Sequence, residues 1–326
     1  MFRRLTKPLL AAGIVTTLAA TAAVATVSAV PAEAASTNLF ASVTASGTLA
    51  FGGGVTSVTH FGTGRYEVRF STNVGKCAYV ATTISAHSQA LQVFTAGGHL
   101  SQNGVYVETK NQGGGLTDGP FNLVVDCGQS GWSYAVVGYN GHLVRATRHT
   151  KLTNLGSGRY DVTFPTRVQG CAYLATVGDP GHGLVFHPNG VYTGSAANPH
   201  TVYIETKNQG GGLSTGIPFH LAVICASAAR VRIAVVAANG IINRGSNLTS
   251  SFLFTTGQYY LVTGTGLSAC TTVATRGSVN KAVPFDPATV EITHGLSSNS
   301  IGIQVRQLLF FGGHPANEAF HAAMVC

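Results

Sequence analysis

Two identical segments carry the side chains of this sequence that are best suited to bind a ligand. The nonapeptide ETKNQGGGL occurs at 108–116 and again at 205–213. Its lysine ammonium and its asparagine and glutamine amides can donate hydrogen bonds to sugar hydroxyls or to anions. Duplication of a turn that needs glycine for positive φ is the alternative explanation, and it requires no ligand. The ligand hypothesis places contacts at Lys110, Asn111, Gln112, Lys207, Asn208 and Gln209.

The duplicated segment is not a phosphate-binding loop. It lacks the GK[ST] signature and a following helical pattern, and both are needed to hold a nucleotide phosphate. The chain as a whole has a formal net charge of +8, with only 9% charged residues. Its cations are spread without clusters or an aromatic platform, so a specific nucleic-acid site is not predicted.

The acidic residues give no sign of a general acid and base. Glu67 and Asp161 occupy equivalent positions of two related segments, and so do Glu108 and Glu205. Such recurrence predicts a shared solvated strand face better than a pair of catalytic carboxylates. A carbohydrate-active enzyme that combines carboxylates from two repeats, with a site between them, is the alternative.

Histidine and serine patterns likewise predict no catalytic or metal centre. His182 and His187 are five residues apart in a loop rich in glycine and proline, and the sequence has no HExxH pattern. It also has no GxSxG motif of the kind that positions a nucleophilic serine. We therefore predict a protein that is not an enzyme and that has no cofactor and no metal site.

Internal repetition determines how the chain is organised. The segment GRYEVRF at 64–70 recurs as GRYDVTF at 158–164, and a weaker copy begins at Gly257. CAYVAT at 77–82 recurs as CAYLAT at 171–176 and as CTTVAT at 270–275, and each copy closes on a phenylalanine six residues before a cysteine. Landmarks that keep one order three times predict three tandem repeats. Their ranges are 38–127, 132–225 and 231–326.

The hydrophobic period within a repeat is two. Tyr66, Val68 and Phe70 alternate with charged residues, which is typical of a half-buried β-strand. Asn140-Gly141 and Asn239-Gly240 lie between apolar runs and predict hairpin turns, because both residue types tolerate positive φ. Repeats of this length with seven or eight short strands predict an all-β fold. We expect three antiparallel β-sandwich domains, Ig-like or jelly-roll-like.

The six cysteines occur two per repeat at matched positions. Pairing within repeats leaves none over, whereas links between neighbouring repeats would leave the first and last unpaired. The closed loops of 50, 54 and 56 residues would each stabilise a repeat by about 4 kcal/mol in the chain-entropy model. The expected disulfides are Cys77–Cys127, Cys171–Cys225 and Cys270–Cys326.

The N-terminal segment resembles a signal peptide. Arg3, Arg4 and Lys7 precede an apolar run, and Ala32-Glu33-Ala34 supplies a small-x-small cleavage pattern. The apolar run is long enough to span a bilayer, so an uncleaved anchor is the alternative. We expect residues 1–35 to be removed and the mature chain to be secreted, without a membrane association. Disulfides persist in that oxidising environment.

The three motifs together give a resemblance. GxYxVxF, CAYxAT and FxLxVxC resemble a tandem repeat module of exported proteins from Gram-positive bacteria. The resemblance covers the mature chain, is strong in the first two repeats and is eroded in the third. It implies no catalytic residues. A more distant likeness, in shape only, is to C1q-like jelly rolls, and it suggests that the three repeats pack as an intramolecular pseudo-trimer.

These observations predict a secreted, non-catalytic binding or structural protein that acts at the cell envelope or outside the cell. An anionic cell-wall polymer or a glycan is the expected partner, because the exterior is electropositive. Besides the carbohydrate-active enzyme, a secreted inhibitor or effector that presents the Lys-Asn-Gln loops remains an alternative.

Overall fold

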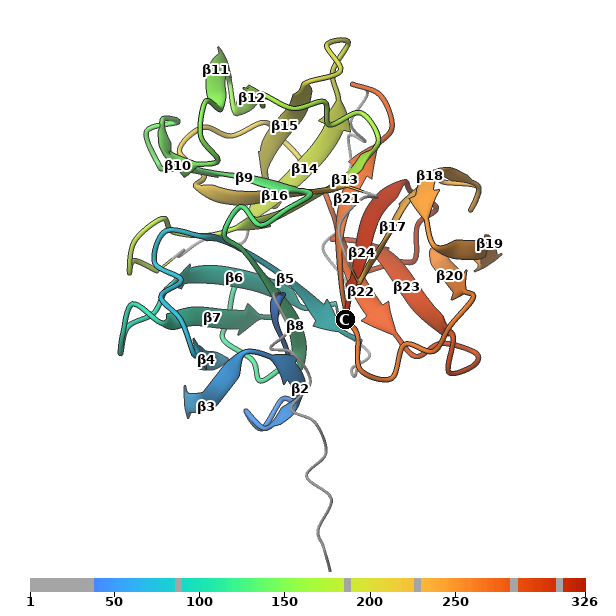
Figure 1. Ribbon diagram of the computed structural model, residues 1–326, viewed down its shortest axis with the longest axis horizontal. Coiled ribbons are helices and arrows are strands. Elements are labelled where there is room, and N and C mark those ends of the chain that lie inside the picture. Colours follow the sequence, from blue (N-terminus) through green and yellow to red (C-terminus); the bar gives the residue numbers. More distant parts are fainter. Residues whose placement is uncertain (1–37, 86–89, 185–188, 226–229, 282–286, 309–312) are drawn as a thin grey trace, which may run out of the picture. The chain divides into compact units, whose positions relative to one another are not determined.

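The computed structural model describes residues 38–85, 90–184, 189–225, 230–281, 287–308 and 313–326. Every regular element within these ranges is a β-strand (Figure 1), which confirms the prediction of an all-β chain. The described residues contain no helix long and apolar enough to cross a membrane. The signal-peptide prediction and His187 lie outside the described residues.

Within the described ranges each repeat has eight strands. The first has β1 (Leu39–Val43), β2 (Leu49–Gly53), β3 (Val55–Gly62), β4 (Arg65–Phe70), β5 (Ala78–Ile84), β6 (Gln92–Gly97), β7 (Gly104–Lys110) and β8 (Phe121–Asp126). The second has β9 (Trp132–Val137), β10 (Leu143–Ala146), β11 (Lys151–Gly156), β12 (Arg159–Thr163), β13 (Cys171–Val177), β14 (Asn189–Ser195), β15 (Thr201–Asn208) and β16 (Phe219–Cys225). The third has β17 (Val231–Val236), β18 (Ile242–Ser246), β19 (Leu248–Thr255), β20 (Gln258–Thr263), β21 (Thr271–Ser278), β22 (Ala288–Thr293), β23 (Ser300–Gln307) and β24 (Phe320–Val325).

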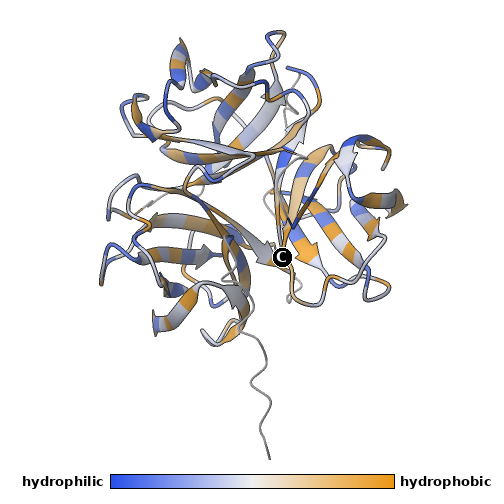
Figure 2. Cartoon of the chain, viewed as in Figure 1, coloured by the Kyte–Doolittle hydropathy of each residue, from blue (hydrophilic) through white to orange (hydrophobic). Residues whose placement is uncertain are grey.

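The strands of a repeat form two antiparallel sets of four around an apolar core. In the first repeat the sets are β3-β4-β7-β6 and β5-β8-β1-β2, and residues of both sets meet in one core cluster. The motif aromatics pair there: the ring centroids of Tyr66 and Phe121 are 5.2 Å apart. Tyr160 and Phe219 repeat this contact at 5.5 Å. The result is a β-sandwich-like arrangement, and Figure 2 shows apolar and polar residues alternating along several of its strands.

Sheets continue from one repeat into the next through parallel pairing. β22 pairs with β5, and β14 pairs with β21, so that two sheets have eight strands each. A parallel bridge between Thr95 and Gly178 makes the corresponding link from the first repeat to the second. Each repeat is therefore hydrogen-bonded to both of the others within residues 35–326, which form one compact unit.

The strands that carry the cysteine motifs are buried on both faces. Every residue of β8, β13 and β24 is buried, so these strands have no solvated face. One face packs into the core of its own repeat. The other joins a second apolar cluster with members from all three repeats, among them Val80, Leu174 and Val273. This second core exists only because the repeats pack together, and the pattern of a single repeat does not reveal it.

The predicted disulfides and turns are present. The pairs Cys77–Cys127, Cys171–Cys225 and Cys270–Cys326 are all formed, with Cα separations of 4.3, 4.1 and 4.1 Å. Gly141 and Gly240 have φ of 70° and 85°, whereas the asparagine before each is outside the positive-φ region. The hairpins therefore use a turn that ends on one left-handed glycine, with a bulge beside it, and only the glycine needs positive φ.

Candidate functional site

The lysines of the duplicated loops are buried rather than presented to solvent. Lys110, at the end of β7, is only 4% exposed, and Lys207 is 3% exposed. The ammonium of Lys110 lies 2.9 Å from a carboxylate oxygen of Glu108, and that of Lys207 lies 3.0 Å from Glu205. Each ammonium also lies over an aromatic ring, an attractive arrangement for a cation. These contacts give both lysines a structural role, and their part in ligand binding stays a prediction.

The amides of the same loops hold the loops in shape. The side-chain oxygen of Asn111 accepts a hydrogen bond from the amide of Gly115, and Asn208 does the same for Gly212. The side-chain amide of Gln209 donates to the carbonyl oxygen of Gln112. The two predicted loops therefore meet, and the contact between their glutamines is one that the sequence did not predict.

The recurring carboxylates do not form a solvated face. Glu67 is fully buried, and its carboxylate accepts hydrogen bonds from the amides of His99 and Leu100. Glu108 is 4% exposed and pairs with Lys110. The expectation of solvated positions is wrong for these residues, because neighbouring turns and strands cover the outer face of the sheet.

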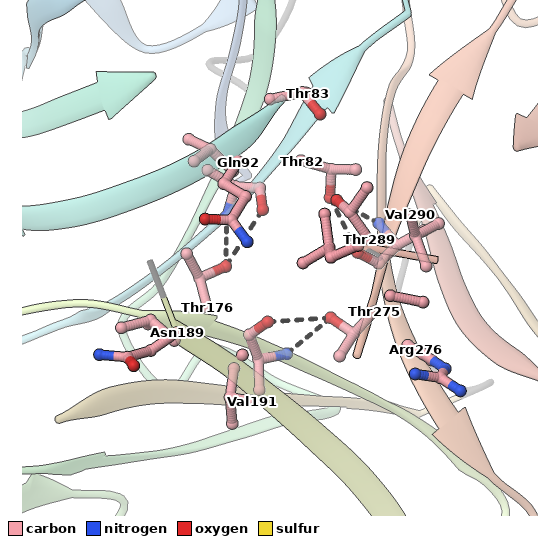
Figure 3. A pocket seen from close by; sticks show the side chains of 18 residues that line it. Thr82, Thr83, Gln92, Thr176, Asn189, Val191, Thr275, Arg276, Thr289 and Val290 are labelled. Carbon is pink, nitrogen blue, oxygen red and sulfur yellow. Dashed lines mark hydrogen bonds between the residues drawn. The ribbon is translucent and has the colours of Figure 1, made fainter. Parts of the chain in front are cut away.

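Three equivalent threonines form a ring of hydrogen bonds that joins all repeats. Thr82, Thr176 and Thr275 are all buried. The Thr82 hydroxyl accepts from the amide of Ala274 and donates to its carbonyl. Thr176 makes the same pair of bonds with Ala81, and Thr275 makes it with Ala175. We call these three residues the threonine ring; Figure 3 shows them with several of their hydrogen bonds. The T of the CAYxAT motif is thus a connector between repeats.

A small cavity lies beside the threonine ring. Its volume is about 80 Å³, and all three repeats line it (Figure 3). Its polar lining includes Gln92, Asn189 and Arg276, and Arg276 is ion-paired with Glu318. No acidic side chain is among the described residues that line it. The volume is far below the roughly 300 Å³ of a typical ligand pocket, so the cavity suits a few water molecules better than a sugar.

Loss of one threonine-ring hydroxyl should weaken the packing between repeats. Thr176→Val keeps the shape of the side chain but leaves the amide and the carbonyl of Ala81 without their partner. We expect the free energy of unfolding to fall by about 1–3 kcal/mol, the usual effect of a buried polar group that loses its hydrogen bond. Chemical denaturation measures it. Thr153→Val, at an exposed threonine of β11, is the control, and an equal loss in both variants would contradict the role of the ring.

Two buried histidines occupy equivalent places between repeats. His220 accepts a hydrogen bond at Nδ1 from the amide of Tyr79, at 3.0 Å, and donates from Nε2 to the carbonyl of Asp179. His321 accepts in the same way from Tyr173, at 3.0 Å, and its Nε2 lies 3.3 Å from the carbonyl oxygen of Ser278. Because a backbone amide must donate to Nδ1, the rings are held neutral. Burial lowers the pKa of each to about 3.

The contact between the third and first repeats differs from the other two. Asn122 replaces the histidine, and its amide donates to the carbonyl of Thr272, which replaces the tyrosine. At the histidine contacts the facing strand needs glycine: a Cβ on Gly178 would lie 2.5 Å from Thr95 Oγ1 and 2.9 Å from His220 Cδ2. At the third contact the corresponding paired residues are Ile84 and Ile292. Two contacts are therefore polar, and the third has larger apolar side chains.

Two equivalent grooves lie beside the histidine contacts. The first groove, with a volume of about 260 Å³, runs between the first and second repeats. The second groove, of about 480 Å³, runs between the second and third repeats. Asn73 and Lys76 line the first at the positions that Arg167 and Gly170 have in the second. Both linings contain cations and, among the described residues, no carboxylate.

Comparison with known proteins finds no match to a family model, to a curated protein or to a solved structure.

The two grooves could not be predicted from the sequence, because their linings combine residues from different repeats. The signal that pointed toward them was the equivalence of the repeats, which predicts that a surface formed between one pair recurs between the next.

Proposed function

We propose that the protein is a secreted, non-catalytic binding protein for an anionic polymer of the cell envelope. Its architecture is three β-sandwich domains, Ig-like or jelly-roll-like, each with one internal disulfide, that pack as an intramolecular pseudo-trimer. The cyclic order of the hydrogen bonds supports this architecture: the first repeat contacts the second, the second the third, and the third the first.

One observation carries the non-catalytic part of the proposal: the polar side chains that recur between repeats are used in internal contacts. The threonine ring, the histidines and the loop lysines are buried and hydrogen-bonded or ion-paired. All nine acidic residues that the structure describes contact a backbone amide, a cation or a hydroxyl. A catalytic acid or base must instead face the substrate, so the repetition is better explained by architecture.

Charge supports the choice of ligand. The chain has 19 basic and 11 acidic residues, of which 16 and 10 follow residue 35, so the mature chain has a basic excess. Such a chain attracts polyanions, and the attraction weakens as salt screens it. In the Lys-Asn-Gln loops the lysines are buried, whereas Asn208 is exposed and Asn111, Gln112 and Gln209 are half-buried, so a glycan contact at these loops would be made by the amides.

The mature chain should bind acidic polymers and not neutral ones. We expect it to be retained on immobilised poly(glycerol phosphate) or acidic polysaccharide at low salt and released by about 0.5 M salt, where the Debye length falls below about 5 Å. Retention on neutral dextran, measured in parallel, should be absent. Equal retention on both matrices, or none on either, would contradict the proposal. Turnover of any tested glycan would favour the enzymatic alternative.

A further inference from the structure

The second groove contains a half-buried arginine, Arg244, that has no acidic partner among the residues that the structure describes. Arg244, on β18, lies with its guanidinium 5.1 Å from the ring centroid of Tyr173. Its Nη1 donates to the hydroxyl of Ser195, whereas Nε and Nη2 are buried and have no hydrogen-bond partner among the described residues. Buried donors without a partner are rare, and each calls for a ligand, an ion or a water.

Comparison with the first groove shows what is missing. Arg145 is the equivalent arginine, and it stacks on Tyr79 in the same way. Arg145 donates from Nε to the carbonyl of Cys77 and from Nη1 to that of Pro180, whereas its Nη2 is buried without a hydrogen-bond partner among the described residues. Burial lowers the pKa of Arg145, and the neighbouring tyrosines and the carboxylate of Asp179 partly oppose that shift. The Asp179 carboxylate accepts hydrogen bonds from the amides of Gly181 and Gly183, so the first arrangement has an acidic residue beside Pro180, and Arg145 makes one more hydrogen bond than Arg244.

Sequence differences change the charges at the second groove. Ser278 occupies the position of Asp179, so a carboxylate is lost. Arg167 occupies the position of Asn73 and Gly170 that of Lys76, so the lysine of the first groove is exchanged for an arginine three positions earlier. Burial lowers the pKa of Arg244, and no carboxylate opposes that shift. Arg167 is exposed at the groove, and its Nη2 donates to the side chain of Gln169.

We propose that the second groove binds an oxyanion, with Arg244 and Arg167 as the residues that contact it. A planar or tetrahedral group with several oxygens matches the donor geometry of a guanidinium, so a carboxylate or a phosphodiester is the chemical class. The anion takes the place that Asp179 has beside the first groove and supplies the charge that Arg244 lacks. This inference rests on the proposed function, for which it names the contact site.

Charge-matched variants test the groove. Arg167→Gln removes the exposed cation, and Arg148→Gln removes an exposed cation outside the groove. We expect Arg167→Gln to weaken binding to the retained polymer about tenfold or more, as the loss of a charged hydrogen bond does, and Arg148→Gln to have little effect. Poly(glycerol phosphate) and polygalacturonate, assayed separately, distinguish a phosphodiester from a carboxylate ligand.

A second variant introduces, beside the second groove, a carboxylate equivalent to that of Asp179. Ser278→Asp places a carboxylate where the first arrangement has one, so it should compete with the ligand without disturbing the fold, and binding should fall at least tenfold. Ser250→Asp, at an exposed serine of β19, makes the same change of net charge as the control. Thermal unfolding of both variants checks that they are folded.

The outcomes separate the two proposals. If the unmodified chain binds no acidic polymer, the proposed function fails. If it binds but Arg167→Gln and Arg148→Gln lose affinity equally, the groove is not the site and the proposed function stands. Inorganic phosphate gives a readout without polymer: at constant ionic strength it should raise the melting temperature of the unmodified protein more than that of Ser278→Asp. Equal shifts would overturn the oxyanion site.

Discussion

Replacement of Asp126 by asparagine should raise the free energy of unfolding by about 4 kcal/mol at pH 7. Asp126 ends β8 and is fully buried, and burial raises the pKa of its carboxyl from 3.8 to about 7. One carboxyl oxygen accepts from the amide of Gly128, and the other has no partner among the described residues. Asparagine keeps the accepted bond and removes the ionisation, which is disfavoured in the folded state by about 1.4 kcal/mol per pKa unit.

The direction of the pKa shift also determines how the free energy of unfolding changes with pH. Because the folded pKa lies above the unfolded one, the unmodified protein loses stability as pH rises from about 4 through about 7. The gap between Asp126→Asn and the unmodified protein should therefore be small at pH 4 and full at pH 7–8. Urea denaturation at several pH values measures it. A gap that is constant with pH would contradict the argument.

Asp118→Asn is the matched contrast. Hydrogen bonds from the amide of Gly64 and from His60 lower the pKa of Asp118, so its ionised form is the one that the fold favours. The same chemical change should then destabilise the protein at pH 7, with an opposite sign to Asp126→Asn. The two variants together separate the effect of the site from the effect of the substitution.

Asp126 also shows what the sequence could and could not predict. In the closing strands of the other repeats, Ile224 and Val325 occupy its position, and both belong to the core shared by the three repeats. The repeat pattern, the strands and the disulfides are local or pairwise features, so spacing alone predicts them. The shared core arises only on packing, so β8 looks half-buried in sequence. Comparison of the three closing strands could have identified Asp126 as an acid in an apolar position.

The burial of the lysines in the duplicated loops could not be predicted from the sequence for a related reason. A lysine at a strand end beside glycines is typical of an exposed loop, and only the fold reveals that Lys110 lies over the ring of Phe94 beside Glu108. Where the third repeat has Gln304 in place of Glu108, the charges are rearranged and Arg306 lies 3.4 Å from Glu291 instead. Identity of the loop sequences therefore reflects a buried polar contact as well as a turn.

The two histidines between repeats lead to the second large effect. Their pKa of about 3 lies well below the ordinary 6.5, so the unfolded chain takes up protons that the folded protein resists. Stability due to the histidines is complete above about pH 6.5 and is lost as pH falls toward 3. At pH 5 each histidine costs about 2 kcal/mol relative to pH 7, or about 4 kcal/mol for both.

Two buried carboxyls oppose this loss in the unmodified protein. Burial raises the pKa of Asp126 and of Glu291 to about 7, so between pH 7 and 5 they favour the folded state as the pH falls. The two histidines and the two carboxyls change the free energy of unfolding with pH in opposite directions and by similar amounts. We therefore expect the stability of the unmodified protein to change little between pH 7 and pH 5. The contribution of the histidines is therefore measured only when they are removed.

His220→Asn combined with His321→Asn should reveal that slope. Asparagine already makes the equivalent contact at Asn122, so the double variant has a precedent in the same fold. Between pH 7 and pH 5, the free energy of unfolding of the double variant should rise by about 4 kcal/mol relative to that of the unmodified protein. This expectation does not depend on the stability of the double variant at pH 7. Replacement of the exposed His142 and His294 by asparagine should leave the dependence of the free energy of unfolding on pH unchanged.

If the free energies of unfolding of the double variant and of the unmodified protein changed with pH in parallel, the imidazoles would not be the proton acceptors, and contacts between the repeats would be insensitive to acid. A gain on acidification would instead show that neutral histidines hold the repeats together, because an imidazolium cannot accept the amide hydrogen bonds of Tyr79 and Tyr173.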